Sequence, residues 1–359
     1  MYITNISLTN FRNYEHINLT LSKGINIFFG DNAQGKTNIL EAIYLCATAR
    51  SHRTNFEKEI IRWGENNTIV NLFLTKQYFS SVIDFSVSKK NKSVLVNKLP
   101  INKLANLFGI LNVVFFSPED LGLIKKSPKE RRRFIDIEIC QLDSLYFSVL
   151  KNYYKILKQR NCYLKHNFGN TDNNILDVWD EKLCQYGEII IAKRKNFIEN
   201  LDYGANLIHL EISGKKENLK IIYEPDIDIK NLKNKFETNR AKDIRTKTTN
   251  NGPHKDDINF LINSQNAKTF ASQGQQRTCI LSVKLAQIDM LKNITGEAPV
   301  LLLDDVLSEL DINRQHYLFK YTTNIQTLIT CTGIDQSILD LKSHGKLFVV
   351  EKANIICKN

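Results

Sequence analysis

The feature that most constrains this chain is a glycine-rich loop between a predicted strand and a predicted helix. Residues 24–43 read GINIFFGDNAQGKTNILEAI, in which Gly30, Gly35, Lys36 and Thr37 have the spacing G-x-x-x-x-G-K-T. The glycines let backbone N–H groups turn toward an anion, and the helix start adds the positive end of its dipole. The segment therefore predicts a phosphate-binding loop. The alternative is a tight strand-to-helix turn that holds no ligand.

Two side chains of the loop indicate a nucleoside triphosphate with its metal ion. Lys36 would place a positive charge at the β- and γ-phosphates, and the Thr37 hydroxyl would be a ligand of Mg²⁺. We therefore expect ATP and Mg²⁺ to bind here. The loop residues expected to contact the nucleotide are Gly30, Asp31, Asn32, Ala33, Gln34, Gly35, Lys36, Thr37 and Asn38.

An acidic pair follows a second predicted strand. In PVLLLDDVLSELD (299–311), four apolar residues lead into Asp304 and Asp305, so both carboxylates end a buried strand. In an open parallel sheet this edge binds ligands. We expect Asp304 to hold Mg²⁺ through water, and Asp305 to act as the general base, with Lys36 as its catalytic partner at the phosphates. The alternative is that the aspartates only cap the strand and the following helix.

A polar segment precedes another predicted helix. Residues 271–282 read ASQGQQRTCILS, and they resemble the signature motif of ABC-type ATPases. In that superfamily the equivalents of Ser272, Gly274 and Gln275 close over the γ-phosphate bound by a second subunit. SELD (308–311) resembles the loop that contacts the partner there. The alternative for the polar segment is an ordinary helix cap without a ligand.

Hydrophobic periodicity predicts an α/β protein divided by a mainly helical insertion. The expected domains are residues 1–120 and 249–359, which would form one ATPase head, and residues 121–248, the insertion. The expected strands are 2–8, 15–21, 24–29, 68–75, 80–88, 92–97, 110–116, 257–262 and 299–304, and the expected helices are 36–48, 130–165, 176–201, with a polar turn at 165–174, and one beginning after 275.

Composition favours a cytoplasmic protein with an anionic partner. Lys and Arg number 49 against 38 Asp and Glu, a net charge of +11, although a generally Lys-rich composition would give the same excess. Runs at 125–133 and 193–195 are candidates for phosphate contact; the alternative is a solvated face. No apolar run reaches the roughly 18 residues of a membrane span, and the N-terminus lacks the layout of a signal peptide.

Longer motifs are similar to the RecF family of bacterial ATPases over essentially the whole chain. They include SHRT (51–54) and FSPEDLGLIKKSPKERRRFID (116–136), together with LKQRN (157–161), GPHKDD (252–257) and the segments described above. NFRNYEHINL (10–19) resembles chromosome-maintenance ATPases, in which equivalents of Arg12 and Asn13 lie near the phosphates; the alternative is an exposed arginine in a hairpin turn. The chain departs from the pattern at Lys255, where arginine is expected. It also has Thr330 and Thr332 where many ABC ATPases place a γ-phosphate-sensing histidine.

The resemblance implies an ABC-type phosphate-loop ATPase head, with a mixed parallel sheet and an antiparallel N-terminal sheet, and a mainly helical inserted second domain. It implies a homodimer that forms head to head on ATP binding, clamps gapped, single-stranded or duplex DNA, and is reset by weak, DNA-stimulated hydrolysis. It also implies a nucleoid-associated protein that acts with RecO- and RecR-like proteins to direct RecA loading. The alternatives are a transporter-type nucleotide-binding subunit, a nucleotide kinase and a DNA clamp in which hydrolysis only resets binding.

Overall fold

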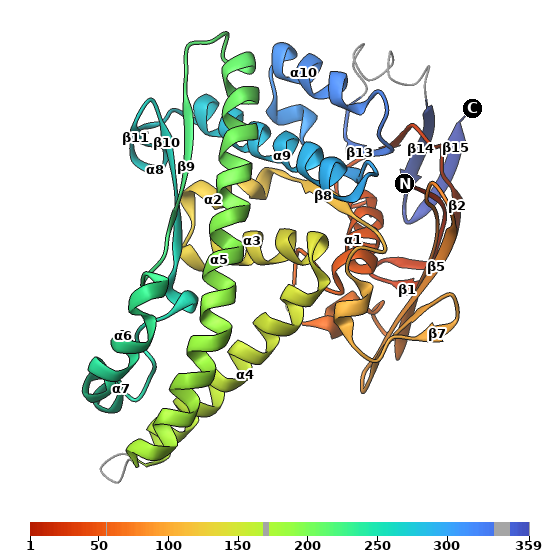
Figure 1. Cartoon of the computed structure of the whole chain (residues 1–359). Coiled ribbons are helices and arrows are strands. Elements are labelled where there is room, and N and C mark those ends of the chain that lie inside the picture. Colours follow the sequence, from red (N-terminus) through yellow and green to blue (C-terminus); the bar gives the residue numbers. More distant parts are fainter. Residues whose placement is uncertain (55, 168–171, 334–344, 359) are drawn as a thin grey trace. The chain divides into compact units, whose positions relative to one another are not determined.

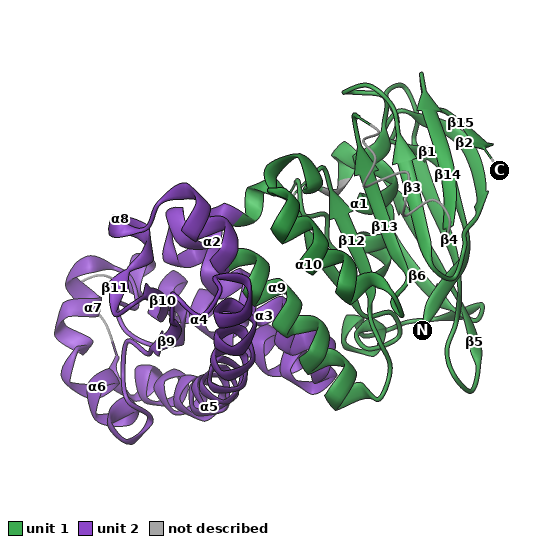
Figure 2. Cartoon of the chain, turned by 90° about the horizontal axis from the view of Figure 1, so that it is seen from above, with its two compact units in different colours: residues 1–120, 280–359 green, residues 121–279 purple. Residues whose placement is uncertain are grey.

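The computed structural model of the chain describes residues 1–54, 56–167, 172–333 and 345–358 (Figure 1). The chain forms two compact units (Figure 2). Unit 1 contains residues 1–120 and 280–359, and unit 2 contains residues 121–279. The second boundary therefore differs from the expected one after residue 248. Segment 249–279 belongs by its contacts to unit 2.

The phosphate loop leaves a six-stranded sheet of unit 1, with strand order β15-β14-β3-β13-β12-β8. All neighbouring pairs are parallel except β14 and β15. β12 and β13 are almost continuously buried, as expected for the centre of a parallel sheet. The bounds are β3 Ile25–Phe29, β8 Val113–Phe116, β12 Val300–Asp304, β13 Thr327–Cys331, β14 Gly345–Glu351 and β15 Asn354–Lys358.

The second sheet of unit 1 is antiparallel, with strand order β2-β1-β4-β5-β6-β7. Its long strands alternate buried and partly exposed residues, so one face packs inward and the other meets solvent. Both predicted sheets, mixed parallel and antiparallel, are thus present. The bounds are β1 Tyr2–Phe11, β2 Tyr14–Thr20, β4 Asn67–Thr75, β5 Ser80–Ser88, β6 Lys92–Val96 and β7 Leu99–Pro100.

Helix α1 (Lys36–Thr48) contacts strands of both sheets and is buried along most of its length. Its apolar side chains join one hydrophobic core with residues from the two sheets. The helix that begins with the predicted phosphate-binding residues Lys36 and Thr37 is therefore fixed by packing on two sides. The other helices among the described residues of unit 1 are α10 Ile312–Thr322 and the short 3₁₀ helices Glu57–Ile60, Leu104–Leu107 and Leu307–Glu309. The 3₁₀ helix Pro118–Leu121 ends at the unit boundary, and α9 (Gln273–Thr295) crosses it.

Unit 2 is built around three long helices, and one expected helix is divided in two. The pattern over 130–165 forms α3 (Pro128–Leu142) and α4 (Ser144–His166), so the prediction of a single helix was wrong. Asp143 separates them, because its backbone is extended and its carboxylate accepts a hydrogen bond from Leu145 N as a helix N-cap. The hydrophobic repeat continues across this break, so periodicity alone did not reveal it.

Helices α4 and α5 (Asn173–Ile212) run antiparallel to each other, as predicted (Figure 1). The rings of Tyr163 on α4 and Trp179 on α5 contact each other in a tilted arrangement, with centroids 4.9 Å apart and an interplanar angle of 58°. α5 extends well beyond the predicted range 176–201. The polar turn predicted between the helices includes residues 168–171, which lie outside the described residues.

A small antiparallel sheet explains why residues 249–279 belong to unit 2. Strand β10 (Asp257–Ile262), which was predicted, pairs with β9 (Leu219–Glu224), which was not. A strand pattern specifies the faces of a strand but not its partner, so the sequence did not reveal this pairing. The other elements of unit 2 are α2 Gly122–Lys125, α6 Leu232–Thr238, α7 Arg240–Thr246, β11 Gln265–Asn266, α8 Ala267–Phe270 and the 3₁₀ helices Ile229–Asn231 and Pro253–Lys255.

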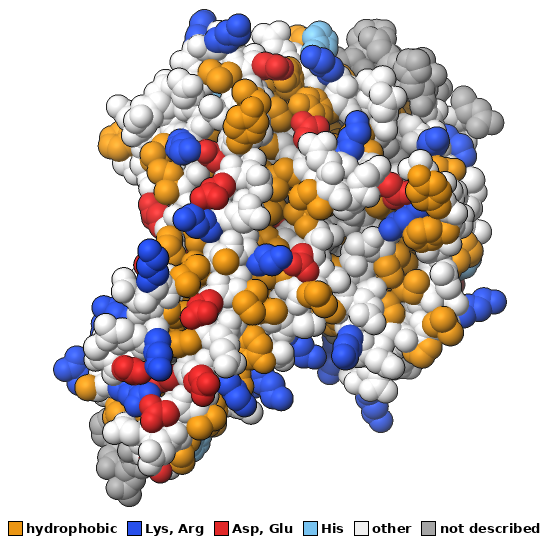
Figure 3. Space-filling view, viewed as in Figure 1, with side chains coloured by type: hydrophobic (Ala, Val, Ile, Leu, Met, Phe, Trp, Pro, Cys, Tyr) orange, Lys and Arg blue, Asp and Glu red, His pale blue; other side chains and the backbone are white. Residues whose placement is uncertain are grey.

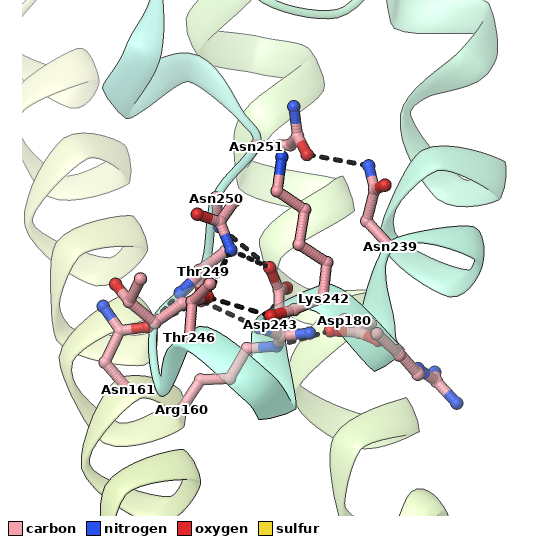
Figure 4. A network of polar contacts seen from close by, with 12 residues as sticks. Arg160, Asn161, Asp180, Asn239, Lys242, Asp243, Thr246, Thr249, Asn250 and Asn251 are labelled. Atoms are coloured by element: carbon pink, nitrogen blue, oxygen red, sulfur yellow. Dashed lines mark hydrogen bonds and ion pairs between the residues drawn. The ribbon is translucent and has the colours of Figure 1, made fainter.

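Buried ion pairs connect the elements of unit 2. Arg160, fully buried on α4, lies 2.7 Å from Asp180 on α5 and 2.8 Å from Asp243 on α7 (Figure 4). It also donates to the Thr249 hydroxyl at 2.8 Å. Because each partner belongs to a different segment, one guanidinium holds together α4, α5, α7 and the chain leading to β10. The LKQRN motif thus contains a structural arginine.

Candidate nucleotide-binding site

The phosphate loop has a backbone that only glycine fits at two positions. At Gly30 a Cβ atom would lie 2.2 Å from Val350 O, well inside contact distance. Gly35 has φ 112°, which side-chain-bearing residues rarely adopt, and its Cβ would lie 2.6 Å from Asn13 Nδ2. The loop therefore approaches its neighbours too closely for any larger residue at these positions.

Lys36 is held inside this loop. Its side chain is only 6% exposed, and Nζ donates hydrogen bonds to Gly30 O at 2.6 Å and to Asp31 O at 2.7 Å. Burial lowers the pKa of the Lys36 ammonium, and the charge of Asp305 opposes that shift. The loop thus holds the Lys36 ammonium at two of its own carbonyl oxygens, and the contact of Lys36 with phosphates stays a prediction.

The two predicted Mg²⁺ ligands lie next to each other. Thr37 Oγ1 donates to Asp304 Oδ1 at 2.8 Å, and Thr330 Oγ1 donates to the same oxygen at 2.7 Å. Hydroxyl and carboxylate oxygens are the hard ligands that Mg²⁺ prefers. The donor set therefore fits a magnesium ion.

Asp305 follows Asp304 in a strained backbone conformation. Its φ is 53°, which is uncommon for a residue with a side chain and is often found at functional sites. Its N–H donates to Thr330 Oγ1 at 2.9 Å, which fixes the residue at the end of β12. Burial raises the pKa of the Asp305 carboxyl; Lys36 opposes this, and Asp304 and Glu309 add to it. A carboxylate with a raised pKa is a better proton acceptor than an ordinary one, which suits a general base.

Lys36, Thr37 and Asp305 line one cavity of ≈ 780 Å³ in unit 1. Its wall is formed by Asp305 at the end of β12, by the phosphate loop, and by the turn between β1 and β2. Predicted residues that line it are Arg12, Asn13, Asn32, Ala33, Gly35, Lys36, Thr37, Asn38 and Asp305; Thr330 and Arg53, Lys58, Glu59, Ile61 and Trp63 complete it. Of the other predicted loop residues, Gly30 and Asp31 hold Lys36, and Gln34 accepts a hydrogen bond from Asn13 Nδ2 at 3.0 Å.

Arg12 contributes to the cavity wall through a buried ion pair. Its guanidinium donates two hydrogen bonds to Glu41, at 2.9 and 2.6 Å, and a third to Glu59 O at 2.7 Å. Burial alone would raise the pKa of Glu41, but hydrogen bonds from Arg12 and Ser51 and the charge of Arg12 lower it. Arg12 lies in the β1–β2 turn, but it is paired with Glu41 and its side chain is only 18% exposed, so the alternative of an exposed arginine does not hold. It stabilises the turn that carries Asn13.

Five residues that line the cavity were not predicted from the sequence: Arg53, Lys58, Glu59, Ile61 and Trp63. Arg53 Nη1 donates to Asn38 Oδ1 at 2.8 Å, yet the side chain stays 44% exposed, so its cation remains accessible from the cavity. The SHRT motif identified this arginine only by resemblance, and its position after the loop helix was the available signal. Trp63 gave no periodic signal, because it lies in a short turn.

The signature-like segment lies in unit 2, where it forms a capping box. Ser272 Oγ accepts from Gln275 N at 3.2 Å, and Gln275 Oε1 accepts from Ser272 N at 2.8 Å. Gln275 Nε2 also donates to Glu217 Oε1 at 2.9 Å. These contacts are those of the helix-cap alternative. They leave Ser272 exposed at the start of α9, and Gly274 follows in the first turn.

The loop after the acidic strand is ordered by its own polar groups. Ser308 Oγ donates to Asp305 O at 2.8 Å, and Asp311 caps α10 by accepting from Arg314 N at 3.0 Å. SELD thus connects Asp305 to the next helix.

Two of the candidate basic residues for DNA contact serve internal ion pairs instead. Arg131 pairs with Asp257 at 2.6 Å, and Arg194 lies buried between Asp136 and Asp256 at 3.0 and 2.9 Å. On the face drawn in Figure 3, Lys and Arg side chains are interspersed with Asp and Glu.

Comparison with known proteins gives full-length matches. Residues 2–340 match the family model for the RecF/RecN/SMC N terminal domain. The "DNA replication and repair protein RecF" of Lachnospira eligens is 46% identical over 363 residues, covering both chains completely. The protein of the same name from Clostridium perfringens (strain SM101 / Type A) is also 46% identical, over 99% of this chain and all of that one.

Solved structures agree with this assignment. The recombination mediator protein RecF-ATP in the RecFOR pathway is 34% identical with a TM-score of 0.93, covering 100% of this chain and 98% of that one. An Smc head bound to the C-winged helix domain of ScpA is 16% identical with a TM-score of 0.58, at 100% and 98% coverage, and shares the fold alone. Within the described residues, no helix is long and apolar enough to cross a membrane. With an ABC-type ATPase fold and these full-length relatives, the chain belongs to the RecF family.

Proposed function

We propose that this chain is an ATP- and Mg²⁺-dependent DNA-binding ATPase of recombinational gap repair and replication. The observation that carries the proposal is the cavity that joins Lys36, Thr37 and Asp305, with Asp304 hydrogen-bonded to Thr37. A kinase-type phosphate loop would not need the Ser272 segment. The full-length relatives are RecF proteins, and this favours a repair ATPase over a transporter-type nucleotide-binding subunit.

In this mechanism, separate residues bind the phosphates, hold the metal ion and accept a proton. The loop backbone and Lys36 bind the β- and γ-phosphates, with Asn13 and Asn38 fixing the loop from one side. Thr37 and Asp304 would hold Mg²⁺, which when bound offsets the negative charge that builds up on the phosphate oxygens. Asp305 accepts the proton of the attacking water, and Thr330 keeps both aspartates in place.

A second subunit would complete the site. We propose that Ser272, Gly274 and Gln275 meet the γ-phosphate held by a partner copy, and that SELD (308–311) lies at that contact. ATP binding then favours the homodimer, and slow hydrolysis releases it. On this view residues 1–120 and 249–359, which include unit 1 and the last segment of unit 2, would act together as the head, and residues 121–248 would act as the arm.

DNA and protein partners follow from the same proposal. The net charge of +11 favours backbone contact with DNA, which would weaken as salt rises. The solved relatives are described as recombination mediator proteins in the RecFOR pathway, which supports RecO- and RecR-like partners. RecA loading and a cytoplasmic, nucleoid-associated location are part of the same proposal.

The decisive experiment measures the size of the protein with and without ATP and Mg²⁺. Asp305→Asn, expected to bind ATP but hydrolyse it slowly, should elute as a dimer only with ATP. Lys36→Ala should bind no ATP and stay monomeric under the same conditions. An Asp305→Asn protein that binds ATP yet remains monomeric at high concentration would refute the two-subunit site.

A further inference from the structure

Four lysines on the surface of unit 2 have no counter-ion among the described residues. Lys125, Lys126 and Lys129 lie in and beside the turn between α2 and α3, and Lys255 lies in the GPHKDD loop (252–257). All four residues are exposed, and none of their side chains makes an ion pair or a hydrogen bond with a described residue. Their charges therefore remain available to an anion outside the chain.

One buried arginine brings the two segments together, although 126 positions separate Arg131 from Asp257. Arg131 Nη1 donates to Lys126 O at 2.9 Å, and its Nε and Nη2 donate to the Asp257 carboxylate at 2.6 and 3.0 Å. The neighbouring Arg132 donates to Asp256 O at 2.5 Å. The α2–α3 turn and the GPHKDD loop thus form one surface, and the arginines behind it are already paired.

The GPHKDD loop is anchored by buried groups, so Lys255 has a defined position. Arg194 donates to Pro253 O at 2.6 Å and pairs with Asp256 at 2.9 Å. Lys255 N donates to Gly252 O at 2.8 Å, which closes the turn. Lys255 is the only exposed residue of the loop. A side chain on a fixed backbone loses less conformational freedom on binding than one on a mobile loop, so the anchoring favours a role in binding.

The lysine charges also oppose the local electrostatics of α3. This helix begins at Pro128, and the N-terminal end of a helix is stabilised by anions and destabilised by cations. Lys125 and Lys126 nevertheless precede the helix, and Lys129 lies in its first turn. Between residues 122 and 135 the only acid is Glu130. A bound anion would offset the lysine charges and the positive end of the helix together.

We propose that Lys125, Lys126, Lys129 and Lys255 contact the phosphate backbone of duplex DNA. This inference rests on the proposed function, because it assigns DNA binding to named residues of unit 2. A duplex carries one negative charge per about 1.7 Å of its axis, which suits several cations on one surface. Lysine is a point charge without a planar set of donors, so these residues bind phosphates and do not read base edges. Binding at this surface is therefore independent of DNA sequence and weakens as salt rises.

Neutral substitutions test the surface in the full-length protein with ATP and Mg²⁺. The triple variant Lys125→Gln/Lys129→Gln/Lys255→Gln leaves Arg131 and its hydrogen bond to Lys126 O in place. Its affinity for a fluorescein-labelled duplex, measured by anisotropy at several KCl concentrations, should be lower than that of the parent protein. The plot of log K against log [KCl] should become shallower by about 0.9 for each lost phosphate contact, and so by about 2.7 for three. Lys255→Arg, which keeps the charge, should bind as the parent does.

A second triple variant controls for the loss of net charge. Lys158→Gln/Lys182→Gln/Lys235→Gln removes three exposed lysines from α4, α5 and α6 of the same unit. It should keep the salt dependence of the parent protein. Both triple variants should bind ATP and unfold at the temperature of the parent. If the first triple variant unfolds at a lower temperature, the single variants Lys129→Gln and Lys255→Gln replace it, and each should lower the slope by about 0.9.

The contrary results separate this inference from the proposed function. Equal losses of DNA affinity in the two triple variants would mean that overall charge attracts DNA, and this overturns the assignment to the four lysines. The assignment is also overturned if the first triple variant keeps the affinity and salt dependence of the parent protein. A parent protein that binds ATP but no duplex even at low salt would instead refute the proposed DNA-binding function.

Discussion

Thr37 Oγ1 donates a 2.8 Å hydrogen bond to Asp304 Oδ1, although 267 positions separate the two residues. Strand β13 makes this contact possible, because it lies between β3, which leads into the phosphate loop, and β12, which ends at Asp304. Thr330 on β13 is level with Phe28 on β3 and with Asp304 on β12. Parallel strands end at one edge of the sheet, so the two motifs meet there.

Replacing Asp304 should abolish the part of the ATP affinity that depends on Mg²⁺ and leave the part that does not. In Asp304→Asn, ATP affinity measured by calorimetry should no longer increase when Mg²⁺ replaces EDTA, because the charged ligand is lost. Thr330→Val, which keeps Asp304 but removes one hydroxyl bonded to it, is the matched control and should retain part of the Mg²⁺ effect. Full Mg²⁺ dependence in Asp304→Asn would exclude this carboxylate as a ligand.

Asp305 should determine the rate of hydrolysis and its dependence on pH. We expect Asp305→Asn to reduce kcat by about 10²–10⁴-fold while ATP still binds. The carboxylate must be unprotonated to accept a proton, and burial raises its pKa above the ordinary 3.8. Activity should therefore fall on acidification at a pH above 3.8. An acidic limb of the pH–rate profile that persists in Asp305→Asn would belong to another group.

The Arg12–Glu41 pair should stabilise unit 1 in a pH-dependent way. Breaking a buried pair costs about 3–5 kcal/mol, so Glu41→Gln should lower the free energy of unfolding measured with urea by that order. The pKa of Glu41 is lowered in the folded state, so its contribution is present above the unfolded value, near 4.5, and is lost as the pH falls below it. A double-mutant cycle with Arg12→Ala should show coupling; additive effects would mean that the two side chains act independently.

Arg160 should be the most sensitive position of the arm. Arg160→Ala leaves Asp180 and Asp243 buried without their cation, and we expect a loss of about 3–5 kcal/mol in the free energy of unfolding. Lys158→Ala, an exposed change on the same helix, should stay within about 0.5 kcal/mol. Equal effects of the two substitutions would contradict the role assigned to the network in Figure 4.

Ser272 can be tested as a helix cap and as a phosphate ligand separately. Aspartate caps helices as well as serine does, so Ser272→Asp should keep the fold and the unfolding temperature. Its negative charge would repel a γ-phosphate, so ATP-dependent dimerisation measured by size should be lost. If Ser272→Asp dimerises normally with ATP, the segment is a cap and nothing more.

The sequence predicted the phosphate-binding elements well because their signals are local. The strand, loop and helix at 24–48 and the acidic end of β12 follow directly from residue order. What it did not predict depends on contacts between distant segments. β9 pairs with β10, Arg131 pairs with Asp257, and Trp63 reaches the cavity through a turn held by β1. The break between α3 and α4 at Asp143 was not predicted for a different reason. The helical spacing of apolar residues continues from α3 into α4, so the pattern indicated one helix.

The hydroxyl of Thr330 has a consequence for how this site can change over evolutionary time. It donates to Asp304 and accepts from the backbone of Asp305, so a single oxygen serves both acidic residues. A substitution that removes this oxygen disturbs the proposed metal ligand, Asp304, and the proposed base, Asp305, together. Substitutions at position 330 should therefore change the affinity for Mg²⁺ and the rate of ATP hydrolysis together. We expect the residue at position 330 to co-vary with residues 304 and 305.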